Sequence, residues 1–93
     1  MENKVRVRTV ISGRVQGVFF RLETKKAAAR YDVFGWVSNQ RDGTVAAVFE
    51  GPKENVDFML AWCKHGPPIA KVFDVDITWE AYKGEFNGFE IRY

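Results

Sequence analysis

Residues 5–30 read VRVRTVISGRVQGVFFRLETKKAAAR, and this stretch decides the expected fold. Polar and apolar side chains alternate over residues 5–12, which predicts a half-buried β-strand. We expect one face of this strand to carry Val5, Val7, Thr9 and Ile11, and the other face to carry Arg6 and Arg8. Residues 21–31 are rich in helix-forming residues and predict a helix whose inner contacts are Leu22, Ala28 and Ala29. The segment between them must connect a strand to a helix.

The middle of the chain predicts a hairpin followed by a second helix. Residues 33–39 and 44–51 are rich in β-branched and aromatic residues, and Asp42-Gly43 supplies the tight turn between these two strands. Pro52 suits the first position of a helix, along which apolar residues recur at helical spacing: Val56, Met59, Leu60 and Cys63.

Two further strands complete the predicted fold. Residues 70–79 form a strand in which Val72 is out of phase, so we expect a bulge near Phe73-Asp74. A short strand follows near residues 88–92. The fold class is therefore α+β: a ferredoxin-like (split β-α-β) sandwich, with an antiparallel sheet of four to five strands and two helices on one face.

The composition predicts one folded domain in a reducing compartment. Hydrophobic residues make up 46% of the 93 residues, which supports a core. No apolar run approaches the ~18 residues of a membrane span, and the N-terminus lacks the layout of a signal peptide. The lone Cys63 and the lone His65 provide neither a disulfide nor a cluster of metal ligands. We therefore expect a cytoplasmic protein without a metal or another cofactor.

Positive charge is concentrated in the first half of the chain. Residues 1–46 hold nine Lys/Arg against four Asp/Glu, whereas residues 47–93 hold five against eight. This asymmetry is either an unevenly charged solvated surface or a face that attracts anions. The net charge of +2 is too small to require a polyanionic partner.

The connecting segment GRVQGVFFR, residues 13–21, has the components of a phosphate cradle. Gly13 and Gly17 permit left-handed or tight conformations and leave room for a ligand. Successive backbone N–H groups, together with the start of the following helix, offer donors to an anion. The Arg21 guanidinium matches phosphate oxygens two at a time. The alternative is an ordinary glycine-rich connection whose arginines face solvent.

A second segment, GWVSNQRDG at residues 35–43, places Asn39 at the end of a strand beside the hairpin turn. The first and third strands are central in a split β-α-β sheet, so Asn39 is expected close to the phosphate loop. An amide both donates and accepts hydrogen bonds and can hold a water in line with a phosphorus atom. The alternative is a polar residue that only ends a strand.

Together these two segments resemble the acylphosphatase family. The first family signature, G-R-V-Q-G-V-x-F/Y-R, is matched by residues 13–21, and the second, G-W-V-x-N-x-x-D-G-x-V, by residues 35–45. Shorter similarities include EGP at residues 50–52, GPP at residues 66–68 and the terminal FEIRY. The resemblance covers most of the chain and implies that residues 1–93 form a single acylphosphatase-like domain.

The resemblance implies hydrolysis of an acyl phosphate to a carboxylate and inorganic phosphate, without a metal, another cofactor or a covalent phosphoenzyme. Arg21 and Asn39 would be the catalytic residues, and Asn39 would position the attacking water. The phosphoryl group would bind to the loop, whose residues are Arg14, Val15, Gln16, Gly17, Val18, Phe19, Phe20 and Arg21. The hydroxyl of Thr24 would either support the site, bond to the helix backbone or lie on the helix surface. We expect a monomer that acts on a small molecule and has no nucleic-acid or membrane partner.

Two positions depart from the family pattern. Phe19 stands where many relatives carry a small residue, so its ring either points into the core or narrows the pocket. Asp32 stands where the helix end often has glycine, and it must adopt left-handed geometry at some cost. Within the loop we expect Arg14 to face solvent or brace the loop rather than bind the ligand, and Gln16 to matter more through its backbone N–H than through its amide.

Two other functions compete with hydrolysis. An RNA-binding module of this fold would stack bases on aromatic residues of the central strands, but residues 5–12 contain none and residues 44–50 contain only Phe49. A regulatory domain would bind a small anion without turning it over. Such modules occur within larger proteins, whereas a chain that begins near the first strand and ends with the last is expected to be freestanding. Oligonucleotide binding and benzoyl phosphate hydrolysis distinguish these functions.

Overall fold

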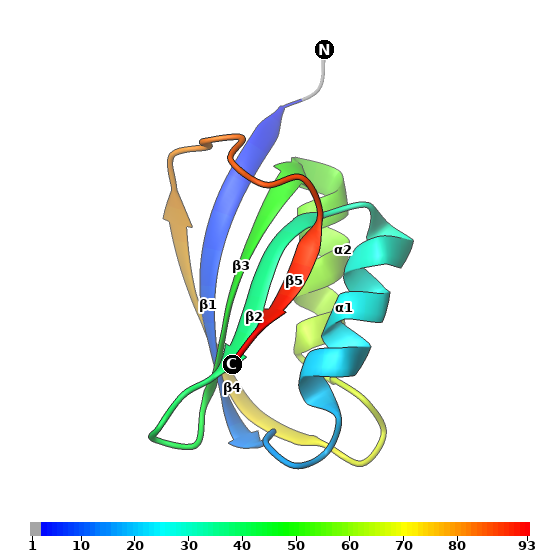
Figure 1. Ribbon diagram of the computed structural model, residues 1–93, viewed down its shortest axis with the longest axis vertical. Coiled ribbons are helices and arrows are strands. Elements are labelled where there is room, and N and C mark those ends of the chain that lie inside the picture. The colour runs from blue at the N-terminus through cyan, green and yellow to red at the C-terminus, as the bar shows by residue number, and fades with distance from the viewer. Residues whose placement is uncertain (1–2) are drawn as a thin grey trace.

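The computed structural model describes residues 3–93, and the elements follow the predicted order (Figure 1). They are β1 (Lys4–Arg14), α1 (Phe20–Tyr31), β2 (Phe34–Asn39), β3 (Val45–Pro52), α2 (Lys53–Cys63), β4 (Lys71–Glu80) and β5 (Phe89–Arg92). The first two residues of the predicted domain lie outside the described residues. Within residues 3–93, no helix is long and apolar enough to span a membrane.

The five strands form one sheet in the order β4-β1-β3-β2-β5. The pairs β1–β3, β1–β4 and β2–β3 are antiparallel, whereas β5 runs parallel to β2. The predicted antiparallel sheet therefore holds for four strands, and the fifth makes the sheet mixed. The reason is long-range: the chain leaves β4 at one edge, crosses the end of the sheet and enters the opposite edge in the direction of β2 (Figure 1).

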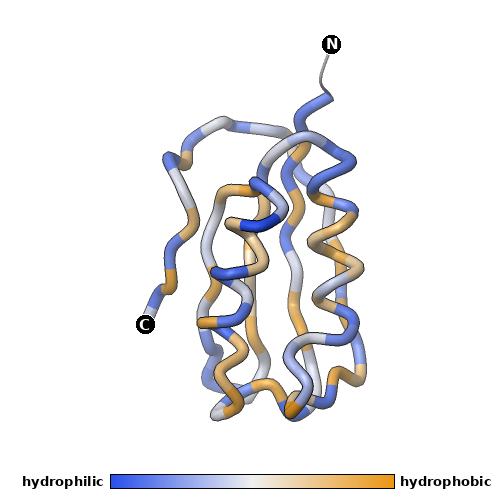
Figure 2. Tube along the Cα trace, turned by 90° about the vertical axis from the view of Figure 1, so that its right-hand side faces the viewer, coloured by the Kyte–Doolittle hydropathy of each residue, from blue (hydrophilic) through white to orange (hydrophobic). Residues whose placement is uncertain are grey.

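Both helices cover the same face of the sheet, as predicted (Figure 1). Along each helix the hydropathy changes repeatedly between apolar and polar residues, as a helix with one buried face requires (Figure 2). The expected inner face of β1 is largely confirmed, because Val7, Thr9 and Ile11 are fully buried. These residues face a core that includes Val37, Val45, Ala47, Phe49, Val56 and Met59.

The predicted inner face of the first helix is partly wrong. Leu22 is 45% exposed and Ala29 is also exposed, whereas Ala28 is buried as expected. The helix begins at Phe20, and the residues that it buries are Phe20, Thr24, Ala27 and Ala28. Their spacing of four, seven and eight residues from Phe20 follows one helical face, so the buried Phe20 ring sets the rotation of α1.

The bulge predicted in the fourth strand is confirmed. Ser12 pairs with Asp74 but Gly13 pairs with Val72, so Phe73 has no partner on β1. Gly13 has a φ of 128°, and a Cβ atom there would collide with the carbonyl oxygen of Lys71. Glycine is therefore required at the end of β1 because the bulged strand approaches its backbone closely.

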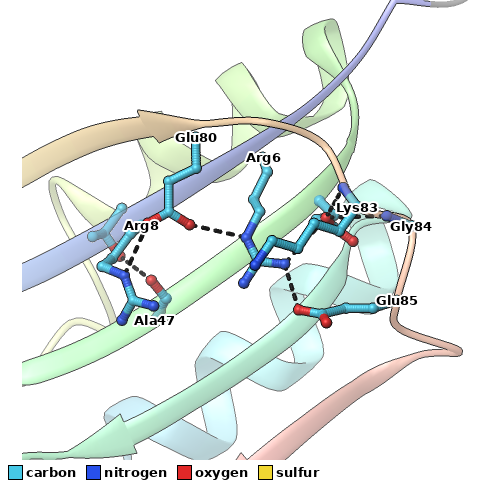
Figure 3. A network of polar contacts seen from close by, with 9 residues as sticks. Arg6, Arg8, Ala47, Glu80, Lys83, Gly84 and Glu85 are labelled. Carbon is cyan, nitrogen blue, oxygen red and sulfur yellow. Dashed lines mark hydrogen bonds and ion pairs between the residues drawn. The ribbon is translucent and has the colours of Figure 1, made fainter.

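Arg6 shares a face of β1 with Arg8, as expected, but it is only 4% exposed, and its Nη1 and Nε atoms pair with carboxylates. Its Nη1 donates to Glu50 Oε2 at 3.2 Å and to Glu85 Oε1 at 2.6 Å, and its Nε donates to Glu80 Oε1 at 2.9 Å. Figure 3 shows the side chains of Arg6, Glu80 and Glu85 pointing toward one another. The hydrogen bond from Arg6 lowers the pKa of Glu80. A buried guanidinium requires such partners, because an unpaired buried charge is costly.

Glu50 extends this network to the segment between β4 and β5. Its Oε2 accepts hydrogen bonds from the backbone N–H groups of Lys83 at 2.9 Å and Gly84 at 3.3 Å, and the side chain is 3% exposed. One buried carboxylate thus fixes the chain that crosses from one sheet edge to the other. The network thereby helps to set the position of β5 beside β2.

We expect Glu50→Ala to lower the free energy of unfolding by about 2–4 kcal/mol, because it leaves two backbone donors and part of a buried guanidinium unpaired. Glu90→Ala is the control: Glu90 pairs with Arg92 at 2.7 Å, but both side chains are about half exposed. Its loss should cost about 0.5 kcal/mol or less. Urea denaturation measures both values, and equal losses would contradict the structural role of Glu50.

Candidate functional site

Three segments that are distant in sequence meet at one end of the molecule (Figure 1): the loop between β1 and α1, the β2–β3 hairpin and the C-terminal end of β5. A cavity of about 380 Å³ lies there, lined by Val15, Gly17, Phe19, Phe20, Arg21, Leu22, Asn39, Ile91 and Tyr93. Arg21 and Asn39, predicted from separate motifs, thus border the same cavity. Of the other predicted site residues, Arg14, Gln16, Val18 and Thr24 do not line it.

The loop between β1 and α1 has backbone donors that the described residues leave without an acceptor. Gly17 has a φ of 74° and Phe19 a φ of 62°, both left-handed. Within residues 3–93, no hydrogen bond is donated by the backbone N–H groups of residues 15–19, and the first amide at this helix end with a backbone acceptor is that of Glu23, to Phe19 O at 3.0 Å. These free donors stand at the positive end of the α1 dipole, which is favourable for an anion.

Apolar side chains anchor the loop to the core. Val15, Val18 and Phe20 are buried, and the Phe20 ring packs against Trp62 with a centroid distance of 5.6 Å. Gly66 also lies against the Phe20 ring, since a Cβ atom there would stand 2.6 Å from Phe20 Cε2. The loop is therefore held by its side chains while its amides stay free.

Gln16 ties the loop to the hairpin through its side chain. Its Nε2 donates to the carbonyl oxygens of Gln40 at 2.7 Å and Thr44 at 2.9 Å, the two residues that close the hairpin turn. The side-chain amide of Gln16 therefore has a structural role that the sequence analysis did not assign to it. The only sequence signal for this role was a glutamine between two glycines. Its two acceptors lie 24 and 28 residues further along the chain, so the sequence around Gln16 does not indicate them.

The hairpin that carries Asn39 is rigidly built. Thr44 donates to Asp42 Oδ1 through its backbone N–H at 3.0 Å and through its hydroxyl at 2.7 Å, which lowers the pKa of Asp42. Asn39 is the last residue of β2 and pairs with Val45. Its Oδ1 is buried and accepts no hydrogen bond from the described residues. A buried acceptor without a partner is uncommon in folded proteins, and this one belongs to a residue that lines the cavity.

Arg21 and Thr24 lie on the first turns of α1 but have different surroundings. The Arg21 guanidinium stands 4.7 Å from the centroid of the Tyr93 ring, and it forms no ion pair within residues 3–93. Thr24 is fully buried, and its hydroxyl donates to Phe20 O at 2.6 Å. Of the alternatives for Thr24, backbone bonding is thus confirmed and the helix surface is wrong. Thr24 fixes the helical turn behind Arg21.

The remaining sequence expectations are resolved by exposure and backbone geometry. Phe19 is 70% exposed, so its ring does not enter the core. Asp32 adopts the expected left-handed conformation, with a φ of 57° at the end of α1. Arg14 is exposed, as expected. Cys63 is fully buried, and burial raises the pKa of its thiol, so it is a core residue rather than a nucleophile.

A larger cavity, of about 720 Å³, is lined in part by Arg6, Arg8, Trp36 and Arg92, but neither Arg21 nor Asn39 lines it. Its arginines already have partners: Arg8 pairs with Glu80 at 3.3 Å and Arg92 with Glu90 at 2.7 Å. The smaller cavity is the better candidate site, because its donors and its guanidinium have no anionic partner in the described part of the chain.

Comparison with known proteins points to the same family as the two sequence motifs. The family model described as acylphosphatase matches residues 7–91. The chain belongs to the acylphosphatase family. It is 54% identical over 92 residues to an acylphosphatase of Pyrobaculum islandicum, covering 98% of this chain and 96% of that one. It is 47% identical over 91 residues to an acylphosphatase of Pelotomaculum thermopropionicum, covering 98% and 99%.

The fold is confirmed by the same family. The solved structure of an acylphosphatase from Coxiella burnetii superimposes with a TM-score of 0.92 at 32% identity, covering 97% of this chain and 94% of that chain. The ferredoxin-like α+β class and the family resemblance expected from the sequence are therefore confirmed. The activity of the family is the hydrolysis of acyl phosphates.

We expect Gln16→Ala to lower the free energy of unfolding by about 1–2 kcal/mol, because two hydrogen bonds between the loop and the hairpin are lost. Gln40→Ala is the matched control, since its exposed side chain makes no hydrogen bond in the described part of the chain and its carbonyl is retained. Chemical denaturation compares the two variants. Equal stability of both variants would show that the Gln16 amide does not hold the loop.

Proposed function

We propose that this protein hydrolyses acyl phosphates, with the phosphoryl group held by the loop amides and Arg21 and the attacking water positioned by Asn39. The observation that carries the proposal is that Arg21 and Asn39, from α1 and β2, line one cavity with the loop. Membership in the acylphosphatase family supports the reaction class.

Binding would use the donors that the fold leaves free. The amides of residues 15–19 and the first amides of α1 have no acceptor among residues 3–93, and they would surround a phosphoryl group. Arg21 would contribute two parallel charge-assisted hydrogen bonds. The charge on the phosphoryl oxygens changes during transfer. Because the loop amides and Arg21 would already be in place, they would stabilise that charge without having to reorganise.

Attack would be directed by the amide of Asn39. A water held at the cavity wall by a hydrogen bond to the side-chain amide of Asn39 would stand beside the phosphoryl group. Its oxygen forms the new bond to phosphorus while the bond from phosphorus to the carboxyl oxygen breaks. The carboxylate leaves with the bonding electron pair, and the proton of the water passes to phosphate or solvent.

The leaving group explains why no general acid is needed. A carboxylate is stable as an anion at neutral pH, so it leaves without being protonated. The residues that line the cavity contain no carboxylic acid, histidine or cysteine side chain. Positioning and charge stabilisation are the contributions that phosphoryl transfer draws on most.

We further propose that the protein acts as a cytoplasmic monomer on small molecules rather than on nucleic acid. The free, buried Cys63 supports a reducing location. Phe49, the one aromatic residue in the two central strands, is fully buried against the core and stacks on Phe89 at 5.7 Å. It therefore offers no exposed ring to a base.

We expect Asn39→Ala to lower kcat for benzoyl phosphate by at least about a hundredfold while inorganic phosphate still binds, because only the water loses its partner. Arg21→Ala should weaken both phosphate binding and turnover, by about 2–5 kcal/mol for binding. Steady-state kinetics and competitive inhibition by phosphate measure these effects.

Two variants control for unspecific effects of these changes. Arg30→Ala removes an exposed arginine from the far end of α1, and Asn87→Ala removes an exposed amide from the segment before β5. Both should retain wild-type turnover. Full turnover by Asn39→Ala would exclude its role, and phosphate binding without any wild-type hydrolysis would favour a non-hydrolytic anion-binding domain.

A further inference from the structure

Phe19 adopts a backbone conformation that is unfavourable for its residue type. Its φ of 62° and ψ of 23° are left-handed, and it stands immediately before α1 without capping the helix through its side chain. A residue with a Cβ atom is strained there, whereas glycine is not. Residues held in such conformations cluster at functional sites, where the surrounding structure imposes them.

The exposed Phe19 ring also lies at the cavity that Arg21 and Asn39 line. Its side chain is 70% exposed, although an aromatic ring of this size is normally buried. Two other exposed apolar residues, Leu22 and Tyr93, line the same cavity as Phe19. Around Arg21 and Asn39, the cavity wall is therefore mostly apolar, and Arg21 is the one residue of its lining with a charged side chain.

The two halves of an acyl phosphate need different surroundings. Under the proposed function, the phosphoryl half takes the loop amides and Arg21, so the acyl half must extend along the rest of the cavity. That part has neither a second cationic side chain to bind a carboxylate nor an acidic side chain to bind an amine. It offers aliphatic and aromatic surface, which favours a flat, uncharged acyl group.

We propose that Phe19 is a specificity-determining residue, and that its ring forms one wall of a subsite for aromatic or extended apolar acyl groups. The inference rests on the proposed function and adds the class of acyl group to it. An acetyl group is too small to cover the ring, so Phe19 would contribute to the transition state of aromatic substrates and little to that of acetyl phosphate.

The test compares kcat/KM for benzoyl phosphate and acetyl phosphate in four proteins: the wild type, Phe19→Gly, Phe19→Tyr and Phe73→Ala. Phe19→Gly should lower the ratio of kcat/KM for benzoyl phosphate to kcat/KM for acetyl phosphate by roughly tenfold, which is the effect expected from losing a modest apolar contact. It should also raise the unfolding temperature, because the left-handed position is then strain-free. Phe19→Tyr retains the ring and should keep the ratio.

Phe73→Ala is the matched control, because Phe73 is 80% exposed in the β4 bulge and does not line this cavity. Its ratio should equal that of the wild type. A folded Phe19→Gly variant with an unchanged ratio would overturn the specificity role while leaving the proposed function intact. Hydrolysis of neither substrate by the wild type would overturn the proposed function, and the specificity role with it.

Discussion

The site depends on one topological constraint: β1 and β3 lie side by side at the centre of the sheet. Because they are antiparallel, the loop that leaves β1 and the hairpin that enters β3 emerge at the same end. Gln16 turns this proximity into a fixed geometry through its hydrogen bonds to Gln40 and Thr44. Residues of the loop and Asn39 of the hairpin are thereby held around a single cavity.

The opposite end of the sheet contributes through a buried charge network. Arg6 and Glu50 pair across β1 and β3, and Glu50 also holds the backbone of Lys83 and Gly84. These contacts direct the chain to the far edge of the sheet, where β5 pairs with β2 in parallel. The end of that strand brings Ile91 and Tyr93 to the cavity. Part of the cavity wall thus depends on an ion pair located at the other end of the strands.

The features that the sequence predicts correctly are those with local signals. Periodicity defines the strands and helices, Asp42-Gly43 marks the hairpin, and the out-of-phase Val72 marks the bulge. The errors have non-local causes. Leu22 and Ala29 were wrongly assigned to the core. The predicted helix began at residue 21 and so omitted Phe20, the buried residue that sets the rotation of α1. The burial of Arg6 depends on carboxylates 44 to 79 residues away, which no local pattern indicates.

The same distinction holds for the site. Arg21 and Asn39 were predicted from their motifs, and both line the cavity, whereas the Gln16 tether and the apolar wall of Phe19, Leu22 and Tyr93 required the fold. The central claim is that the free loop amides and Arg21 bind one phosphoryl group beside Asn39. A crystal structure with bound phosphate tests it most directly. The account predicts one anion that contacts Arg21 and the amides of residues 15–20, with Asn39 within reach of a bridging water, about 3 Å from each partner. Phosphate bound elsewhere, or amides turned away from it, would contradict the account.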